Sequence, residues 1–251
     1  MAPLSRNLRL RLLLRSLVIQ GSWNYRTMQG AGLGFILIPI LRRLYGDDRE
    51  ALDAALGRHV GFFNANPYLA TVAVAALARM EGDGVTVEQV ERFKSALVSP
   101  LGSLGDRLVW ARWRPLCVFV ALLIFLAGSV WWVACVVFLA LYNSVAMGLR
   151  VWGLQIGWRE GKDVGRALMS SRLRRLPDRL TIPLAIAGGA VLPPLVLAFG
   201  DTSSVGSIPV IGIALVLAGL GYVYPVAARR IVAAGLVAAA VVVIGLEMIL
   251  W

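Results

Sequence analysis

The side chains of this chain that could do chemistry are amides and one carboxylate set in otherwise apolar segments. They are Gln20, Asn24, Gln29, Asn64, Asn66 and Asp106. Amide side chains both donate and accept hydrogen bonds, and a carboxylate is a strong acceptor. Such groups are costly at membrane depth, so their presence as a set favours a binding site on a transport path.

Each of these residues also has a purely structural interpretation. Asn64 and Asn66 stand beside a proline and could cap a broken helix. Asp106 could form a local ion pair with Arg107 or Arg112. Both interpretations stay open at the level of sequence.

Two aromatic residues, Trp23 and Tyr25, lie within the same polar stretch. An aromatic ring can stack on a ligand, but it more often packs against other side chains. We therefore keep Trp23 as a binding candidate beside the packing alternative.

Composition places the chain among membrane proteins. Of its 251 residues, 59% are hydrophobic, whereas soluble domains are roughly 45–50% apolar. The formal charge is nonetheless +11, from 25 Lys and Arg against 14 Asp and Glu. In a membrane protein such an excess faces the cytoplasm and anionic lipid. We expect no nucleic-acid partner, because no basic and aromatic recognition module is present.

The elements that must position these residues are helices. Residues 4–19 alternate arginine with leucine, which predicts an amphipathic helix on the inner membrane surface rather than a cleavable signal peptide. Residues 60–78 are uncharged but contain Asn-Ala-Asn-Pro, which favours a broken or re-entrant helix. Pro100, Gly102 and Gly105 interrupt the apolar pattern of Leu97–Pro115. Phe62–Tyr68 and Leu97–Pro115 are thus two interrupted segments that could face a common cavity.

The second half of the chain is predicted to form membrane-spanning helices. Residues 116–149 carry no charge, and as one helix they would measure about 50 Å, against a membrane core of about 30 Å. A transmembrane hairpin with a turn near Ala127–Ser129 resolves this excess. A basic cytoplasmic segment, 150–179, follows. In it Gly153, Gly157, Gly161 and Gly165 recur every four residues, which favours close helix packing.

Three further apolar runs complete the chain at 182–199, 208–228 and 231–250, and the first is expected to be kinked or broken at its Gly and Pro pairs. The expected fold is therefore an all-α, multi-pass integral membrane protein. Its regions are 1–115 (amphipathic and re-entrant helices), 116–149 (hairpin), 150–179 (cytoplasmic) and 180–251 (C-terminal spans), all within one domain. Neither Cys117 nor Cys135 stands in a metal-binding motif, so we expect no metal and no cofactor.

Four sequence blocks in the first half of the chain occur in the same order as the motifs of a known family. They read QGSWNYRTMQ at 20–29, LGFILIPILRRLY at 33–45, RHVGFFNANPYLA at 58–70 and ALVSPLGSLGDRLVWARWRP at 96–115. Together they resemble the IID membrane subunit of mannose/fructose/sorbose-type sugar phosphotransferase systems (PTS). Four blocks in register are far more specific than any one of them. Residues 143–157 add a weaker likeness.

The resemblance implies a function in the bacterial inner membrane. Such a subunit pairs with a IIC subunit, and oligomers of these pairs bind a hexose and pass it across. A cytoplasmic IIB subunit, phosphorylated by IIA, then phosphorylates the sugar. The IID subunit carries no phosphoryl group and does no chemistry of its own. We therefore expect a structural or interface role for His59, which matches a helix position of the family and not a phosphorylation site.

Departures from the family pattern leave an alternative. Arg26 stands where the family commonly has Glu, Asn66 where many members have His, and Arg107 where Ser or Pro is usual. Trp113 replaces a small or polar residue. The alternative is a regulatory or scaffold paralogue that has lost transport.

Overall fold

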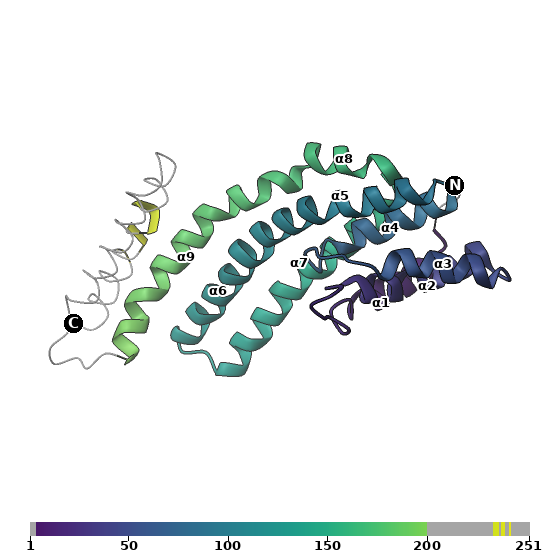
Figure 1. The fold of residues 1–251 in the computed structure, drawn as a ribbon. Helices are drawn as coiled ribbons and strands as arrows, with labels where there is room; N and C mark the ends of the chain where they lie inside the picture. Colours follow the sequence, from purple (N-terminus) through teal and green to yellow (C-terminus); the bar gives the residue numbers. More distant parts are fainter. Residues whose placement is uncertain (1–3, 200–232, 236, 239–240, 242–251) are drawn as a thin grey trace. The chain divides into compact units, whose positions relative to one another are not determined.

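Regular structure is helical throughout the part of the chain that the computed structural model describes, namely residues 4–199, 233–235, 237–238 and 241 (Figure 1). The α-helices are α1 (Arg6–Ser16), α2 (Gly30–Tyr45), α3 (Arg49–Val60), α4 (Ala70–Gly82), α5 (Val87–Gly105), α6 (Arg114–Leu126), α7 (Trp131–Glu160), α8 (Val164–Ser170) and α9 (Leu176–Phe199). A π-helical segment, Asp106–Trp113, joins α5 to α6, and 3-10 turns precede α8 and α9. The all-helical prediction holds for these residues.

The chain divides into two compact units. The first unit comprises residues 1–107 and 143–174, and the second comprises 108–142 and 175–251. One boundary falls inside the π-helical segment and another inside α7, which continues without interruption through Arg150. The expected border between a hairpin and a cytoplasmic segment at 149/150 is therefore not a break in the helix.

Helix α4 is the centre of the first unit. Its run of Ala and Val buries almost every side chain, from Ala70 to Ala78. Small side chains on all faces let neighbouring backbones come close. Helices α1 and α2 contact α4, and α3 packs along α2 (Figure 1). The uncharged part of α4, Ala70 to Ala78, is therefore a protein core element rather than a lipid-facing span.

Two glycines of the four-residue repeat, Gly153 and Gly157 on α7, pack against α4. A Cβ on Gly153 would come within 2.3 Å of Thr71 Oγ1, and one on Gly157 within 2.3 Å of the Val72 carbonyl. The prediction of close helix packing is therefore confirmed for these two. Gly161 lies just after α7 with φ +55° but is also close to α4, since a Cβ there would come within 3.1 Å of Arg79 Cδ. The prediction is wrong for Gly165, which faces open space.

The helix predicted at residues 4–19 is α1, but its leucines lie on both faces, so the amphipathic part of the prediction is wrong. Leu8 and Leu12 are buried against the first unit, whereas Leu10 and Leu14 are exposed. Arg15 lies 4.3 Å from the ring centroid of Phe35 on α2. The helix thus presents an apolar stripe outward, on the side opposite its packed face.

The uncharged stretch 60–78 is broken, as its Asn and Pro predicted. Helix α3 ends at Val60, α4 begins at Ala70, and the residues between them form no regular helix. Isolated backbone bridges pair Met28 with Phe63 and with Asn24. The non-helical segment is thereby fastened to the polar stretch that precedes α2.

The stretch Leu97–Pro115 is a correction to the sequence interpretation. We expected an interrupted element, but the chain stays helical from Val87 to Leu126. Pro100 is accommodated inside α5, and the irregularity takes the form of π-helical winding from Asp106 to Trp113. Such winding alters where side chains point without ending the helix, and it is frequent at functional sites.

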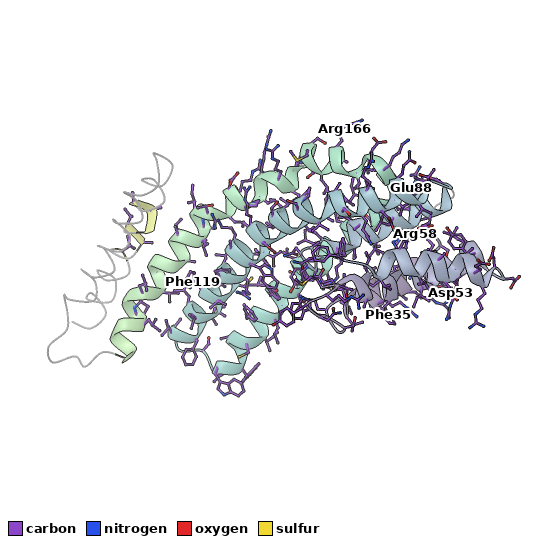
Figure 2. The ribbon with its side chains drawn as sticks, in the orientation of Figure 1. Phe35, Asp53, Arg58, Glu88, Phe119 and Arg166 are labelled. Carbon is purple, nitrogen blue, oxygen red and sulfur yellow. The ribbon has the colours of Figure 1, made fainter. Side chains whose placement is uncertain are left out.

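In the second unit, α6 and the start of α7 enclose the predicted turn. Residues 127–130 connect the two helices, and Gly128 takes φ +93° there, a conformation that suits glycine. Helix α9 packs along α6 (Figure 1). Where a break was expected at Gly188, α9 is continuous, and this glycine instead admits the ring of Phe119 (labelled in Figure 2).

Among the described residues, two regions have the length and apolarity to cross a membrane, 87–126 and 131–192. Only 22% and 17% of their apolar windows are buried inside the protein. A core helix of a soluble protein would be mostly covered, so the exposure favours contact with lipid. The expected spans at 208–228 and 231–250 lie outside the described residues, apart from a few helical positions.

Candidate functional site

Asn66 and Asp106 come together although they are far apart in the sequence. Asn66 Nδ2 donates to Asp106 Oδ1 at 3.0 Å, and Asn66 is 1% exposed. The non-helical segment before α4 supplies the first residue, and the start of the π-helical segment supplies the second. The two segments expected to face a common cavity are thus in direct contact at this pair.

The amide of Asn66 serves two purposes. Its Oδ1 accepts from the backbone N–H of Tyr68 at 3.1 Å, which orders the turn into α4. Its Nδ2 reaches Asp106. The capping and binding interpretations therefore apply to different atoms of one side chain. Gly105 is required beside it, because a Cβ there would lie 2.2 Å from Asn66 Cβ.

Gln29 holds the same segment from the other side. Its Nε2 donates to the Ala65 carbonyl at 2.8 Å, and its Oε1 accepts from the Ala65 N–H at 3.3 Å. The Gln29 backbone N–H donates to the Phe63 carbonyl at 2.8 Å. The buried Gln29 amide thus bonds both the N–H and the carbonyl of Ala65. Because Asn66 follows Ala65 in the chain, these bonds also fix the position of Asn66.

Two further residues near this pair, Arg150 and Tyr68, were not predicted from the sequence to belong to a site. The Arg150 guanidinium carbon lies 4.5 Å from the ring centroid of Tyr68, and Arg150 is only 6% exposed. Its Nη1 donates to the Ala146 carbonyl at 3.3 Å. A buried cation on an aromatic face is worth more than an exposed one. The signal available in the sequence was an arginine directly after the uncharged run 116–149.

The remaining candidates lie apart from this cluster. Gln20 and Asn64 are exposed. Asn24 shapes a turn, because its Oδ1 accepts from the N–H groups of Arg26 and Thr27 at 3.0 and 2.9 Å. Within that turn the Asn24 side chain is engaged by its own neighbours.

Trp23 packs edge-to-face on Tyr25, with ring centroids 4.8 Å apart. Tyr25 is 86% exposed and Trp23 44% exposed. Exposed aromatic pairs suit a protein interface better than a solvated sugar site, since such rings are favoured as interface anchors.

A second polar cluster in the first unit consists of Tyr45, Arg58, His59 and Glu81. Glu81 accepts from Arg58 Nε and Nη2, both at 2.7 Å, from the Tyr45 hydroxyl at 2.5 Å, and lies 2.7 Å from His59 Nε2. Its side chain is 2% exposed. Figure 2 labels Arg58 on α3, the helix that directs this side chain toward α4.

Protonation in this cluster follows from its contacts. Burial alone would raise the pKa of Glu81, but the hydrogen bonds from Arg58, His59 and Tyr45 outweigh it and lower that pKa to about 2. Burial lowers the pKa of His59, partly offset by Glu81. His59 is therefore neutral near pH 7, donates from Nε2, and leaves Nδ1 unprotonated, in keeping with the lack of a partner for that buried atom. A structural role for His59 fits this arrangement.

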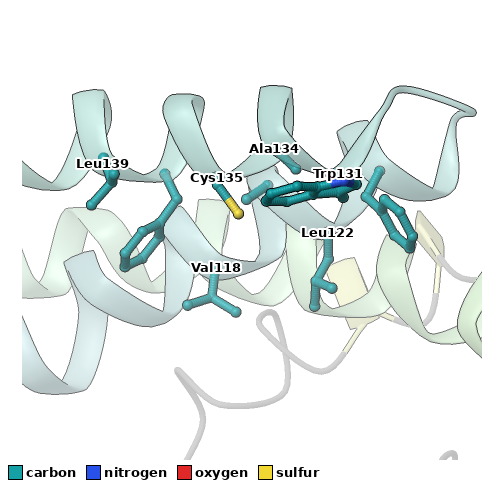
Figure 3. A pocket seen from close by; sticks show the side chains of 9 residues that line it. Val118, Leu122, Trp131, Ala134, Cys135 and Leu139 are labelled. Atoms are coloured by element: carbon teal, nitrogen blue, oxygen red, sulfur yellow. The ribbon is translucent and has the colours of Figure 1, made fainter.

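The second unit has a pocket of a different kind. It measures about 530 Å³, lies between α6 and α7, and is lined by carbon-rich side chains including Val118, Leu122, Trp131 and Phe138 (Figure 3). No polar surface faces it. Such a pocket cannot satisfy a polyhydroxylated ligand, because each buried hydroxyl needs a hydrogen-bond partner.

No group of three or more His, Cys, Asp or Glu side chains among the described residues is arranged to hold a metal ion. The Asn66–Asp106 pair offers an amide and a carboxylate, both of which form hydrogen bonds. Long apolar helices define a helical membrane protein, and one of its units holds a buried polar pair.

Comparison with known proteins identifies the family. The family model described as "PTS system mannose/fructose/sorbose family IID component" matches residues 3–197. This chain belongs to that family of membrane components.

Individual relatives agree with this assignment. The chain is 30% identical to the mannose-specific EIID component of Escherichia coli (strain K12) over 184 residues, 71% of this chain and 64% of that protein. It is 30% identical to the sorbose-specific EIID component of Klebsiella pneumoniae over 176 residues, 68% of this chain and 63% of that protein. The matched region thus spans less than two thirds of these relatives' own length.

Solved structures give the same result at the level of fold. A chain of the cryo-EM complex of the mannose transporter ManYZ with microcin E492 superposes with a TM-score of 0.60 and 28% identity, covering 76% of this chain and 71% of that one. A second chain, described as a membrane protein, superposes with a TM-score of 0.68 at 24% identity and covers 88% of this chain and 98% of that one. The latter likeness concerns the fold alone.

Proposed function

We propose that this chain works with a IIC subunit in the bacterial inner membrane to bind a mannose-type hexose and to translocate it for phosphorylation by IIB. In this proposal IIA supplies the phosphoryl group to IIB, and IIC–IID pairs assemble into a homo-oligomer. The chain crosses the membrane several times and performs no chemistry itself.

The observation that carries the proposal is the Asn66–Asp106 pair in a chain of this family. A carboxylate and an amide offer an acceptor and a mixed donor–acceptor, which match the hydroxyl groups of a hexose. The pair lies where a non-helical segment meets π-helical backbone. Discontinuous helices of this kind are typical of solute sites in transporters.

The exposed aromatic pair supports a subunit contact. Trp23 and Tyr25 present rings outward from the turn that Asn24 organises. Aromatic residues with little conformational freedom are frequent at the centre of protein interfaces. We assign this surface to the IIC partner.

A transport-deficient paralogue is the second candidate, and Arg26 is the observation that favours it. This residue is exposed beside Tyr25 and reverses the charge that the family pattern commonly carries there. A reversed charge at an interface rim changes partner choice and association rate. A chain altered in this way could form a regulatory complex without moving sugar.

The experiment is phosphoenolpyruvate-dependent uptake in cells that lack other hexose permeases. The chain is expressed with IIC and IIAB subunits of the mannose/fructose/sorbose type, and uptake of labelled mannose, fructose and sorbose is followed. Copurification measures assembly in the same cells. Uptake of at least one sugar supports the proposal, whereas assembly without uptake of any sugar supports the regulatory paralogue.

A further inference from the structure

A second concave site lies in the first unit, at the end of α7, away from the Asn66–Asp106 pair. It measures about 330 Å³ and draws on three helices. Its basic members are Arg9 from α1, Arg79 from α4 and Arg159 from α7, and its apolar members are Leu4, Leu154 and Trp158. A site with guanidinium groups on one part of its lining and hydrocarbon on another suits an anionic amphiphile.

Arg79 caps the C-terminal end of α7, which borders the site. Its Nη1 donates to the carbonyls of Trp158 and Arg159, both at 2.8 Å. The last carbonyls of a helix carry partial negative charge and would otherwise oppose an anion. Because Arg79 neutralises them, the end of α7 accepts a negative group that a bare helix C-terminus would repel.

Two acidic side chains adjoin the arginines without cancelling them. Arg79 Nε donates to Asp83 at 3.3 Å, and Arg159 Nε donates to Glu160 at 2.7 Å. A guanidinium has five N–H donors, and these bonds engage only part of each set. With three cations against two neighbouring carboxylates, the site keeps a net positive charge.

The surroundings indicate that the anion comes from a lipid. Helix α1, which carries Arg9, exposes the stripe Leu10, Leu14 and Leu17 on the face opposite its packed side. An arginine-rich helix with an outward apolar stripe lies at a membrane–water boundary, where anionic headgroups are concentrated. A free anion would require only the arginines, whereas the partly exposed ring of Trp158 provides a contact for the glycerol and acyl region.

We propose that Arg9, Arg79 and Arg159 form a binding site for the phosphate of an anionic phospholipid. The lipid joins α1 to the ends of α4 and α7 and thereby fixes this arginine-rich helix on the body of the first unit. The proposal requires that the protein lies in a membrane but is independent of which solute it transports.

The test uses the full-length chain together with any subunits that copurify, in mild detergent, so that no bilayer surface potential contributes. Native mass spectrometry counts retained dioleoyl-phosphatidylglycerol against dioleoyl-phosphatidylcholine. The test variant is Arg9→Gln with Arg159→Gln. Its matched control is Arg11→Gln with Arg166→Gln, which removes the same charge from exposed positions outside the site. Arg79 is left unchanged because it caps α7.

The wild type and the control should retain phosphatidylglycerol in preference to phosphatidylcholine. Each arginine beside an anionic headgroup contributes about fivefold in affinity, so the test variant should bind roughly 25-fold more weakly. Circular dichroism spectra identical to the wild type show that both variants fold. Equal retention of the two lipids by the wild type, or equal losses in test and control variants, would overturn the proposal.

A second measurement places the lipid. Brominated phosphatidylglycerol should quench the fluorescence contributed by Trp158, which Trp158→Phe identifies, and quenching should be lost in the test variant. Millimolar inorganic phosphate is the probe for the other source of the same chemistry. If phosphate displaces the lipid at that concentration, the site takes a free anion and the lipid assignment is wrong. Lipid retention needs no sugar, so a failure of uptake and a failure of lipid binding are read separately.

Discussion

Replacing Glu81 by Gln tests the buried cluster that holds α3 against α4. The carboxylate accepts from Arg58 twice, from Tyr45 and from His59, with its side chain 2% exposed. The substituted amide would turn N–H groups toward donors and would leave the Arg58 guanidinium without its counter-ion. Removing one partner of a buried ion pair costs about 3–5 kcal/mol.

An independent estimate comes from protonation. The contacts of Glu81 lower its pKa from 4.5 to about 2, which corresponds to about 3 kcal/mol at roughly 1.4 kcal/mol per tenfold change in proton affinity. Since the folded-state pKa is depressed, this stability is present above pH 4.5 and is lost as the pH falls toward 2. Burial also lowers the pKa of His59 below 6.5. Below pH 6.5, unfolding therefore takes up a proton at His59, so the protein loses stability as the pH falls.

The assay is equilibrium unfolding by SDS in mixed micelles, followed by circular dichroism at pH 7.5, 5.0 and 3.5. Glu81→Gln should lose about 3–5 kcal/mol at pH 7.5 and should lack the wild-type loss between pH 5.0 and 3.5. The control is Glu88→Gln, the same change at an exposed position of α5 (labelled in Figure 2), which should stay within about 0.5 kcal/mol of wild type. If Glu81→Gln behaves like this control, the cluster does not stabilise the fold and the reasoning fails.

Three further outcomes are expected. Asp106→Asn weakens a charge-assisted bond to Asn66, so we expect about tenfold lower hexose uptake with unchanged copurification; a loss of copurification instead would make Asp106 structural. Gly105→Ala forces a Cβ to 2.2 Å from Asn66 Cβ and should lower the free energy of unfolding by about 1–3 kcal/mol in the same assay. Its control, Gly102→Ala, meets open space in the same helix and should raise that free energy by up to about 1 kcal/mol. Trp23→Ala should reduce copurification with the membrane partner without lowering thermal stability, and equal losses of both would refute an interface role.

The helical nature of the chain and the contact between the Asn66 and Asp106 segments could be predicted from sequence, although only the first of these segments is interrupted. The Asn and Pro between Asn64 and Tyr68 are local signals, and local signals set where α4 begins. The family motifs placed Asp106 in the same site region before any geometry was available. The observed bond between Asn66 and Asp106 then required only that both segments face one another.

Other features lie beyond local pattern. The winding of Asp106–Trp113 has no signature in the sequence, because a π-helix differs from an α-helix by its hydrogen-bond register and not by its residue types. Tyr45, Arg58 and Glu81 stand far apart along the chain, and nothing in the composition of α4 indicated that its last carboxylate is buried. Arg150 looked like the first residue of a basic segment but is enclosed beside Tyr68.

The burial of α4 has a consequence for synthesis. The helix is complete once residue 82 has been made, yet the glycines that cover it, Gly153 and Gly157, and the Trp158 carbonyl that Arg79 binds come much later. At about 5–20 residues per second, the ribosome needs roughly 4–15 s to reach them. Throughout that interval the Ala- and Val-rich helix lacks this cover. The face of α4 that packs on α7 therefore stays open on the nascent chain until α7 arrives, while α1 and α2 are already available to pack on it.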